Sequence, residues 1–185
     1  PLWFFHRSGI GDGIQGLRGR RVSIGPEGSG ARALALELIE RIKIASLIGE
    51  LSGFTPQVAA EKLIAGDIDA AFIITAWDSP VVQRLIKAEG IELASFPRAD
   101  AYIALYPFLN RLVLPSGVAD LLNNRPPADV ALLAPKAAEK ELNLAYIVND
   151  AIPQILVSDQ TRLRQILVNL ISNAVKFTQQ GEVVI

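Results

Sequence analysis

The chain of 185 residues contains no cysteine. This absence excludes disulfides, thiolate metal sites and cysteine nucleophiles, and it fits an extracytoplasmic and a cytosolic protein equally well. A large net charge is also missing, because 18 Lys and Arg residues stand against 19 Asp and Glu residues. No long-range field would therefore attract nucleic acid or an anionic membrane surface, and we expect no nucleic-acid partner.

No apolar run is long enough to cross a bilayer. The longest run, residues 70–77, is far shorter than the ~20 residues that a spanning helix needs. The chain begins at Pro1 without a basic and apolar leader and stops at Ile185 within an apolar run, so we expect both ends to be cut. Half of the residues are hydrophobic, which suffices for one ordinary core or one and a half small ones.

Short apolar runs alternate with helical patterns over residues 1–96. This alternation predicts an open, largely parallel α/β sheet covered by helices on both faces. Between residues 112 and 134, short extended pieces broken by proline and glycine are typical of a crossover or edge region. We expect strands at 2–5, 22–24, 44–51, 69–75 and 91–96, and helices at 31–42, 56–64 and 80–87.

The last third of the chain predicts fewer and weaker elements, except for one helix. A polar helical stretch at 137–141 leads into a strand at 144–148, and a short strand follows at 155–157. The clearest helix of the chain is expected over about residues 159–175.

Residues 11–16 match the dinucleotide-binding pattern G-x-G-x-x-G. That pattern requires a helix after the glycines and a second parallel strand beyond it. Too few residues separate Gly16 from the strand at Val22 for such a helix. We therefore interpret residues 11–16 as a flexible connecting loop.

Residues 25–30 form a second glycine-rich segment, which follows a strand and opens a helix. Backbone N–H groups and the helix dipole gather around an anion in this context. Ala31 and Arg32 replace the lysine and hydroxyl of a phosphate-binding loop, so a ligand carboxylate fits better than a nucleotide phosphate. A plain helix cap with Ser29 as the capping residue is an equal alternative.

The run L-R-G-R-R-V-S-I-G-P-E-G-S-G-A-R-A-L-A at residues 17–35 resembles the solute-binding proteins of TAXI-type TRAP transporters. The resemblance continues through residues 65–72, 78–83 and 96–102 and covers about residues 1–135. It implies one lobe of a type 2 periplasmic-binding-protein-like fold. Such proteins close two α/β lobes on a small organic acid, often amino-acid-like or dicarboxylic, and deliver it to a membrane permease.

The same resemblance implies a ligand site. The ligand carboxylate would be held by the backbone at Gly28, Ser29 and Gly30, with Arg32 nearby. Asp78 and Ser79, at the start of the next helix after a strand, would face the same cleft. Because the resemblance begins partway through the family's pattern, we expect most of the first lobe to be missing and the cleft to have one wall.

Two stripes run along the helix expected near the chain end. We expect the apolar stripe to be buried and the polar stripe either to be solvated or to present oxygen ligands and a cation to one object. Asparagine is a mediocre helix former, which favours the functional alternative. The apolar residues are Leu163, Ile166, Leu167, Leu170, Ile171 and Ala174, and the polar ones are Arg162, Gln165, Asn169, Asn173 and Lys176.

The run D-Q-T-R-L-R-Q-I-L-V-N-L-I-S-N-A-V-K-F-T at residues 159–178 closely resembles the N-box helix of sensor histidine kinases, and residues 132–140 and 144–146 resemble the start of the same ATPase domain. The resemblance implies an incomplete histidine-kinase-type (Bergerat) α/β sandwich over about residues 132–185. ATP and Mg²⁺ would be the cofactors of the parent kinase, with phosphate oxygens completing the metal's octahedron.

That resemblance also assigns roles to three residues. The residue matching Asn173 chelates the Mg²⁺ that bridges the ATP phosphates, once the ATP site is complete. The residue matching Asn169 lies one turn earlier in the same site, and the one matching Lys176 approaches the phosphates.

Several parts of a working kinase are not in the sequence. No D-x-G-x-G adenine-binding segment, glycine-rich ATP lid or phospho-acceptor histidine helix is found, and His6, the one histidine, lies in a predicted strand. We interpret His6 as a satisfied surface or core residue. Residues 135–185 also fall short of a typical domain. We therefore expect the chain by itself neither to catalyse phosphoryl transfer nor to bind ATP or Mg²⁺ tightly.

We divide the chain into a solute-binding lobe, 1–134, and the opening of an ATPase domain, 135–185. Three hypotheses follow. In the first, the chain is a fragment of a sensor histidine kinase, from a membrane-bound dimeric parent with a solute-binding sensory region. In the second, it is a TRAP-type periplasmic binding module for a small organic acid, with a permease partner and an adventitious kinase-like tail. In the third, it is a folded but inert chimera. The lobe would be periplasmic or extracytoplasmic and the kinase part cytoplasmic.

Overall fold

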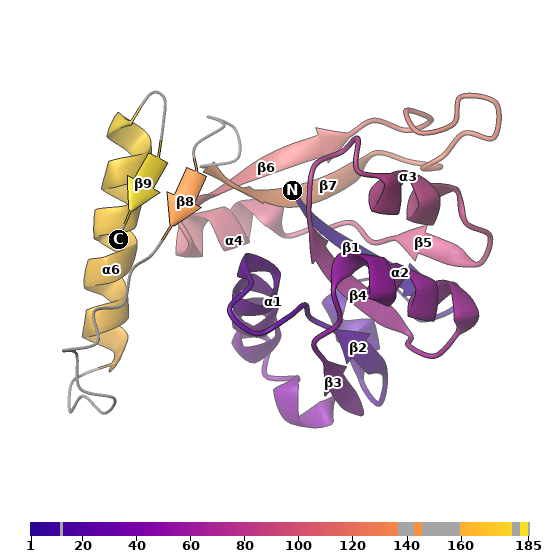
Figure 1. The fold of residues 1–185 in the computed structure, drawn as a ribbon, viewed down its shortest axis with the longest axis horizontal. Coiled ribbons are helices and arrows are strands. Elements are labelled where there is room, and N and C mark those ends of the chain that lie inside the picture. Colours follow the sequence, from indigo (N-terminus) through magenta and orange to yellow (C-terminus); the bar gives the residue numbers. More distant parts are fainter. Residues whose placement is uncertain (12, 137–142, 146–159, 179–181, 185) are drawn as a thin grey trace. The chain divides into compact units, whose positions relative to one another are not determined.

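The computed structural model describes residues 1–11, 13–136, 143–145, 160–178 and 182–184 (Figure 1). The chain forms two compact units, the first made of residues 1–99 and 111–133 and the second of residues 100–110 and 134–185. The predicted division at residue 134 stays a prediction, because compactness alone does not define a functional domain. None of the described helices combines the length and apolar character that a bilayer crossing requires.

The first unit is built on a mixed sheet. Its strands follow the order β3-β2-β4-β1-β7-β6, and β5 pairs with β1 outside this order. β2 runs parallel to β3 and β4, whereas β1 runs antiparallel to β4, β5 and β7. The strands are β1 (Leu2–Arg7), β2 (Arg21–Ser23), β3 (Glu50–Ser52), β4 (Ala70–Ile74), β5 (Ile91–Leu93), β6 (Leu109–Leu114) and β7 (Val130–Pro135).

The predicted "largely parallel" sheet is therefore wrong for the strands around β1. A parallel return needs a crossover connection, usually a helix. In the described part of the connection between β1 and β2, the structure has the short 3-10 helix Ile14–Leu17 and positive φ values at Gly9, Gly11 and Gly13. Without a crossover helix the chain turns back, and β1 ends at the same edge of the sheet at which β2 begins. The sequence predicts a flexible loop over residues 11–16, whereas within the described residues the 3-10 helix begins at Ile14.

Three helices confirm the predicted periodic segments: α1 (Gly30–Arg41), α2 (Pro56–Ala65) and α3 (Pro80–Lys87). Proline at the first helical position starts α2 and α3, where its missing N–H costs nothing. The connections β2–α1–β3 and β3–α2–β4 cross the sheet in opposite directions. Because such crossovers are right-handed, α1 and α2 lie on opposite faces of the sheet, as the sequence predicted.

The predicted strand at 44–51 is wrong in its first half. A 3-10 helix, Ala45–Leu47, precedes β3. Ile44 is 1% exposed and Leu47 is 44% exposed. The predicted strand at 91–96 is also shorter, because β5 ends at Leu93.

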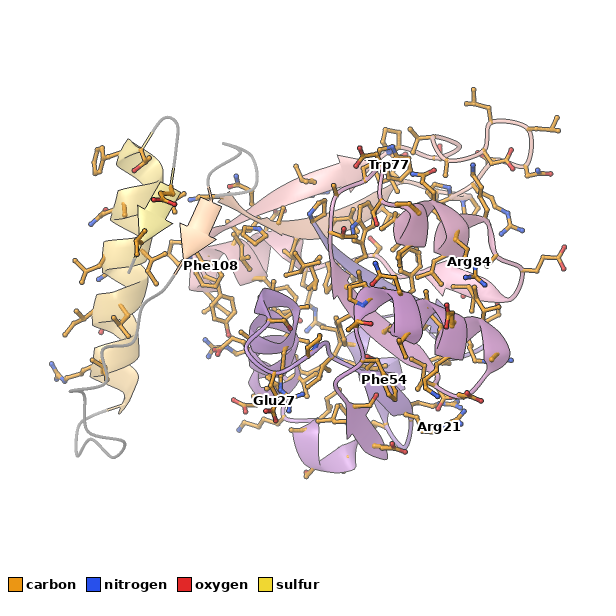
Figure 2. All side chains as sticks on the ribbon, in the orientation of Figure 1. Arg21, Glu27, Phe54, Trp77, Arg84 and Phe108 are labelled. Carbon is orange, nitrogen blue, oxygen red and sulfur yellow. The ribbon has the colours of Figure 1, made fainter. Side chains whose placement is uncertain are left out.

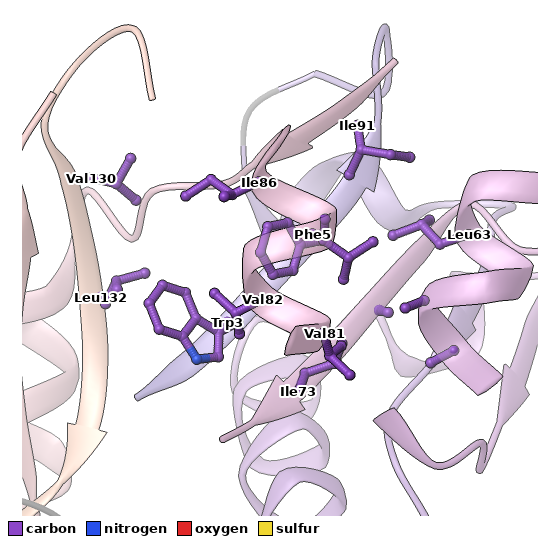
Figure 3. Packing of buried hydrophobic residues seen from close by; sticks show 14 of the residues in the cluster. Trp3, Phe5, Leu63, Ile73, Val81, Val82, Ile86, Ile91, Val130 and Leu132 are labelled. Atoms are coloured by element: carbon purple, nitrogen blue, oxygen red, sulfur yellow. The ribbon is translucent and has the colours of Figure 1, made fainter. Parts of the chain in front are cut away.

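The core of the first unit is organised by β1, whose side chains alternate between two buried faces. Trp3 and Phe5 pack with Val82 and other apolar residues of α2 and α3 on one face (Figure 3). On the other face, Phe4 stacks on Phe72 with ring centroids 4.5 Å apart and planes 6° apart. Burial on both faces explains why β1 reads as a continuous apolar run.

Besides most of α4 (Ala99–Leu105), the described part of the second unit contains two strands and one helix. β8 (Asn143–Ala145) pairs in parallel with β9 (Glu182–Val184), and α6 (Gln160–Phe177) lies between them in sequence. β8 confirms the start of the strand predicted at 144–148. The elements predicted at 137–141 and 155–157 lie outside the described residues.

The predicted burial of the apolar stripe on α6 is wrong over its first three turns. Ile166 and Leu170 are 56% and 59% exposed, and Leu163 and Leu167 are also exposed. Only the C-terminal part of the stripe is covered, where Ile171 and Ala174, with Val175, pack on Val183 of β9. The two short strands described here are too small to cover an 18-residue helix.

An ion pair joins the start of β2 to the residue before β4. Arg21 donates from Nη2 to Oδ1 of Asp69 at 2.9 Å and from Nε to Oδ2 at 3.2 Å, and its backbone N–H donates to Oδ2 at 2.8 Å (Figure 2). Hydrogen bonds from the Arg21 side chain hold the pKa of Asp69 below its usual value. Two parallel donors on one carboxylate fix the register of the two strands.

Replacing this carboxylate tests that role. We expect Asp69→Asn to lower the free energy of unfolding by about 1 kcal/mol at pH 7, a figure kept small because the Arg21 side chain is partly exposed. The pKa of Asp69 is lower in the folded chain than in the unfolded one, so its contribution is complete above about pH 4 and is lost as pH falls through the folded pKa. Urea unfolding at several pH values should show the two proteins converging in acid.

The pair between Lys62 and Asp67 is the matched control. Its atoms are 3.3 Å apart and its carboxylate side chain is 60% exposed, so Asp67→Asn should change stability by less than about 0.5 kcal/mol. Equal changes in the free energy of unfolding for Asp69→Asn and Asp67→Asn would contradict a special role of Asp69.

A buried hydroxyl gives a second stability prediction. Ser23 is 0% exposed, and its Oγ has no hydrogen-bond partner within the described residues. We expect Ser23→Ala to raise the free energy of unfolding by up to about 1 kcal/mol, because it removes an unsatisfied polar group. In contrast, Ser95→Ala should lower it by about 1 kcal/mol, since Ser95 Oγ accepts from Ala131 N at 3.0 Å. Thermal and urea unfolding that show a loss for Ser23→Ala would contradict this reading.

Candidate functional site

The carboxyl ends of β3, β2 and β4 lie at one edge of the sheet, because these three strands are parallel neighbours. The loop after each strand leads directly into the N-terminus of a helix: α2 after β3, α1 after β2 and α3 after β4. In open α/β sheets, ligands bind at such carboxyl ends. This edge is therefore the place to examine the predicted ligand residues.

The turn between β2 and α1 depends on glycine. Gly25 and Gly28 have φ values of 89° and 74°, in the left-handed region that side chains disfavour. A Cβ atom on Gly25 would also lie 2.9 Å from Ser29 Oγ. Gly30, in contrast, has open space, since a Cβ there would meet only Ile74 Cδ1 at 3.9 Å.

The hydrogen bonds of this turn show a true helix cap. Ser29 Oγ accepts from Arg32 N at 3.2 Å and donates to Pro26 O at 2.7 Å. Ser29 N also donates to Pro26 O, at 3.2 Å. The capping interpretation is confirmed, and it leaves other donors unused: the amide N–H groups of Gly28, Gly30 and Ala31 have no acceptor within the described part of the chain.

Arg32 lies over the same turn. Its Nη1 atom reaches Gly25 O at 3.5 Å, a long and weak contact. A Cβ atom on Gly53 would lie 3.4 Å from this nitrogen, which places the guanidinium between the turn and the residue that follows β3. The turn thus carries a cation beside its unused amides.

The loop between β4 and α3 is held at several points. Trp3 Nε1 donates to Thr75 O at 2.9 Å, and Gln83 Nε2 donates to Trp77 O at 2.8 Å. Ser79 occupies the N-cap position of α3, but its side chain makes no capping hydrogen bond. Asp78 is exposed. Ser79 therefore keeps a hydroxyl that its own helix does not use.

The six predicted ligand residues fall into two groups at this edge. Gly28, Ser29, Gly30 and Arg32 share the turn before α1, whereas Asp78 and Ser79 belong to the loop before α3. Figure 2 shows Trp77, which precedes Asp78, well apart from Glu27 of the turn. The structure brings the first group together and places the second group farther along the same edge.

Sequence reasoning missed the third loop, which follows β3. Gly53 lies beside Arg32, and the ring of Phe54 lies 5.2 Å from Lys62 Nζ. The signal was present in the run S-G-F-T-P, in which a glycine follows a short strand and a proline opens a helix. The expectation of one long strand over residues 44–51 hides this signal.

The predicted nucleotide residues lie on α6. Asn169 and Asn173 are exposed one turn apart, and the side chain of Lys176 is outside the described residues. No group of three or more His, Asp or Glu residues that could hold a metal is found in the described ranges. His6 lies in β1 with 3% exposure and pairs Nδ1 with Arg7 O at 2.9 Å, which confirms it as a satisfied core residue.

Comparison with curated proteins finds histidine kinases. A stretch of 54 residues is 48% identical to probable histidine kinase 3 of Oryza sativa subsp. japonica, covering 29% of this chain and 5% of that protein. A stretch of 71 residues is 44% identical to the sensor histidine kinase GacS of Pseudomonas protegens, covering 38% of this chain and 7% of that protein. The chain thus spans only a small part of the length of these relatives.

Among solved structures, the periplasmic aliphatic sulphonate binding protein SsuA from Escherichia coli matches 56% of this chain and 40% of its own, with 19% identity and a TM-score of 0.41. A histidine kinase sensor domain with similarity to periplasmic binding proteins matches 50% of this chain and 38% of its own, with 22% identity and a TM-score of 0.36.

The model of the NMT1-like family matches residues 2–142. This match includes the whole sheet of the first unit, with the glycine turn before α1 and the loop before α3. The chain therefore belongs to the NMT1-like family.

Proposed function

We propose that this chain is part of a sensor histidine kinase and that its NMT1-like lobe binds a small organic acid at the turn before α1. One observation carries the proposal. The amides of Gly28, Gly30 and Ala31 have no acceptor within the described residues, and they stand at the N-terminus of a 12-residue helix. Unused donors at the positive end of a helix dipole attract a carboxylate.

The surrounding residues support an acid as the ligand. Arg32 adds a positive charge to the same turn, at 3.5 Å from Gly25 O. We propose that the ligand carboxylate lies between the amides and this guanidinium, and that Asp78 and Ser79 contact the rest of the ligand. Asp78 would then suit the ammonium group of an amino-acid-like ligand. The resemblance of residues 17–35 to TAXI-type solute-binding proteins supports this class.

The curated relatives support the kinase assignment, because two histidine kinases match stretches of 54 and 71 residues. We propose that α6 is an N-box helix, with Asn173 as an Mg²⁺ ligand and Asn169 and Lys176 near the phosphates of ATP. Its exposed residues Ile166 and Leu170 would pack on the remaining sheet of an ATPase sandwich. The lobe corresponds to the extracytoplasmic part of such a kinase and α6 to its cytoplasmic part, although the sequence between them contains no run long enough to span a bilayer.

The other candidate is a TRAP-type transport module whose kinase-like tail has no role. It shares the proposed ligand site but requires a permease as partner. The 48% identity to a histidine kinase favours the sensor.

The carboxylate site is tested by a charge placed beside it. Gly30→Asp fits the open space next to Ile74 and suits the first turn of a helix, so the fold should keep its stability. The new carboxylate would repel the ligand's own, and we expect the affinity for glutamate or succinate to fall by about tenfold or more. The measurement is a titration of the ¹⁵N-labelled chain, following the amide signals of Gly28, Gly30 and Ala31.

Gly30→Ala is the control, since it adds a Cβ atom at the same position without a charge. It should bind like the unchanged chain, and the uncharged succinamide should move none of these signals. Glutamate and succinate that leave the turn amides unmoved, or bind Gly30→Asp as tightly as Gly30→Ala, would show that the carboxylate is not held at this turn.

The nucleotide proposal makes a separate prediction for this chain. One face of α6 carries Asn169, Asn173 and Lys176, which would contact the metal ion and the phosphates. None of these residues would enclose the purine of ATP. Affinity falls tenfold for each ~1.4 kcal/mol removed, so three contacts should leave Mg-ATP in the millimolar range. Isothermal titration that finds saturable binding below about 100 μM, abolished by Asn173→Ala, would show a more complete site.

A further inference from the structure

A hollow of about 490 Å³ lies in the first unit, away from the candidate carboxylate site. Its walls are residues 90–95, which include β5, and residues 123–130, and His6 and Ser8 also line it. β1 shows the separation of the two places. Leu2 pairs with Ile74 at the carboxyl end of β4, whereas His6, at the other end of β1, pairs with Ala70.

One wall of the hollow is an open strand edge. β5 pairs with β1 and with no other described strand. Ser8 N donates to Gly90 O at 2.9 Å and Ala94 N donates to Phe4 O at 2.8 Å, so every second residue between them bonds toward β1. Ile91 and Leu93 are the alternate residues, and their N–H and C=O groups point to the outer edge.

The opposite wall is held in shape by its own hydrogen bonds. Asp120 N donates to Arg125 O at 3.2 Å and Arg125 N donates to Asp120 O at 2.9 Å. Gly117 N donates to Pro126 O at 2.9 Å. Arg125 Nη1 also donates to Ala88 O at 3.2 Å, across from the loop to the end of α3. A ligand would therefore enter a groove that exists before binding, which lowers the entropy cost of binding.

Two carboxylates and one guanidinium line the groove, so the balance of charge is negative; the guanidinium is that of Arg125, whose Nη1 donates to Ala88 O. Glu92 is 56% exposed, and its nearest cationic partner is His6 Nδ1 at 4.0 Å, which is charged only when protonated. Asp129 is exposed and uses Oδ1 to accept from Ser116 N at 2.9 Å. Neither carboxylate forms an ion pair with a lysine or arginine among the described residues. Apolar side chains at Ile86 and Val130 line the same hollow.

We propose that this groove binds an extended peptide segment that carries a basic side chain. The peptide adds a strand to the outer edge of β5, exchanging hydrogen bonds with Ile91 and Leu93. Its lysine or arginine lies between Glu92 and Asp129, and its alternate apolar side chains lie against Ile86 and Val130. An open strand edge is a template for such a partner, because another backbone supplies donors and acceptors at the spacing of a strand.

The probe is an end-capped peptide of sequence Thr-Val-Lys-Val-Thr, titrated into the ¹⁵N-labelled full chain. We expect the amide signals of Ile91 and Leu93 to move, with a dissociation constant of about 1 mM or below. A peptide with glutamate in place of lysine should bind about tenfold more weakly, as should the lysine peptide against Glu92→Gln. Asp129→Asn should also weaken binding, while its amide oxygen can still accept from Ser116 N.

Leu93→Pro tests the strand edge itself. It removes the outward N–H of Leu93 and leaves the bonds of Glu92 and Ala94 toward β1, which is the position where an edge strand tolerates proline. We expect binding to fall by about tenfold or more. If this variant fails to fold, the unchanged chain is titrated with the lysine peptide N-methylated at alternate amides. N-methylation removes the peptide's hydrogen bonds to the strand edge and so tests the same contact.

Three outcomes overturn the proposal. The first is no movement of Ile91 and Leu93 at about 5 mM lysine peptide, well above the expected dissociation constant. The second is equal binding of the N-methylated peptide, which would make the hollow a pocket for compact molecules that ignores the strand edge. The third is equal binding of the glutamate peptide, which removes the role of Glu92 and Asp129.

Discussion

The first unit depends on the way β1 is enclosed. This strand pairs with β4 along one side and with β5 and β7 along the other, and its side chains are buried on both faces of the sheet. The stacked rings of Phe4 and Phe72 hold it from one face, and the cluster around Trp3 and Phe5 from the other. Everything else in the unit is placed by reference to this strand.

Because β1 runs antiparallel to β4, two different kinds of surface lie at the two ends of β1. At the Leu2 end of β1, the parallel strands lead into helix N-termini. The amides of Gly30 and Ala31 there have no acceptor within the described residues. At the Arg7 end, β5 leaves an open strand edge opposite a preformed loop. We propose that the first surface binds a small anion and the second a peptide backbone, so that one lobe would present two recognition chemistries at the two ends of one strand.

The sequence predicted the local elements well where periodicity and turn residues agree. Proline at 56 and 80 and the glycines around Ser29 marked the starts of α1, α2 and α3 within a residue or so. Strand direction was not predictable, because an apolar run reads the same in a parallel and an antiparallel pair. The exposed turns of α6 show a further limit of the pattern. The spacing of Leu163, Ile166 and Leu170 predicts a face that packs, but these side chains are exposed, because the spacing does not specify a partner for the face.

The glycine turn before α1 has a consequence for how this lobe can diverge. The groups proposed to hold the acid are main-chain amides, which no point mutation at Gly28 or Gly30 deletes unless it brings in proline. What can change are the side chains of the neighbouring loops, such as Phe54 and Asp78. If the turn holds a carboxylate as we propose, such a lobe could change its solute through these side chains while the main-chain amides that anchor the acid are inherited unaltered.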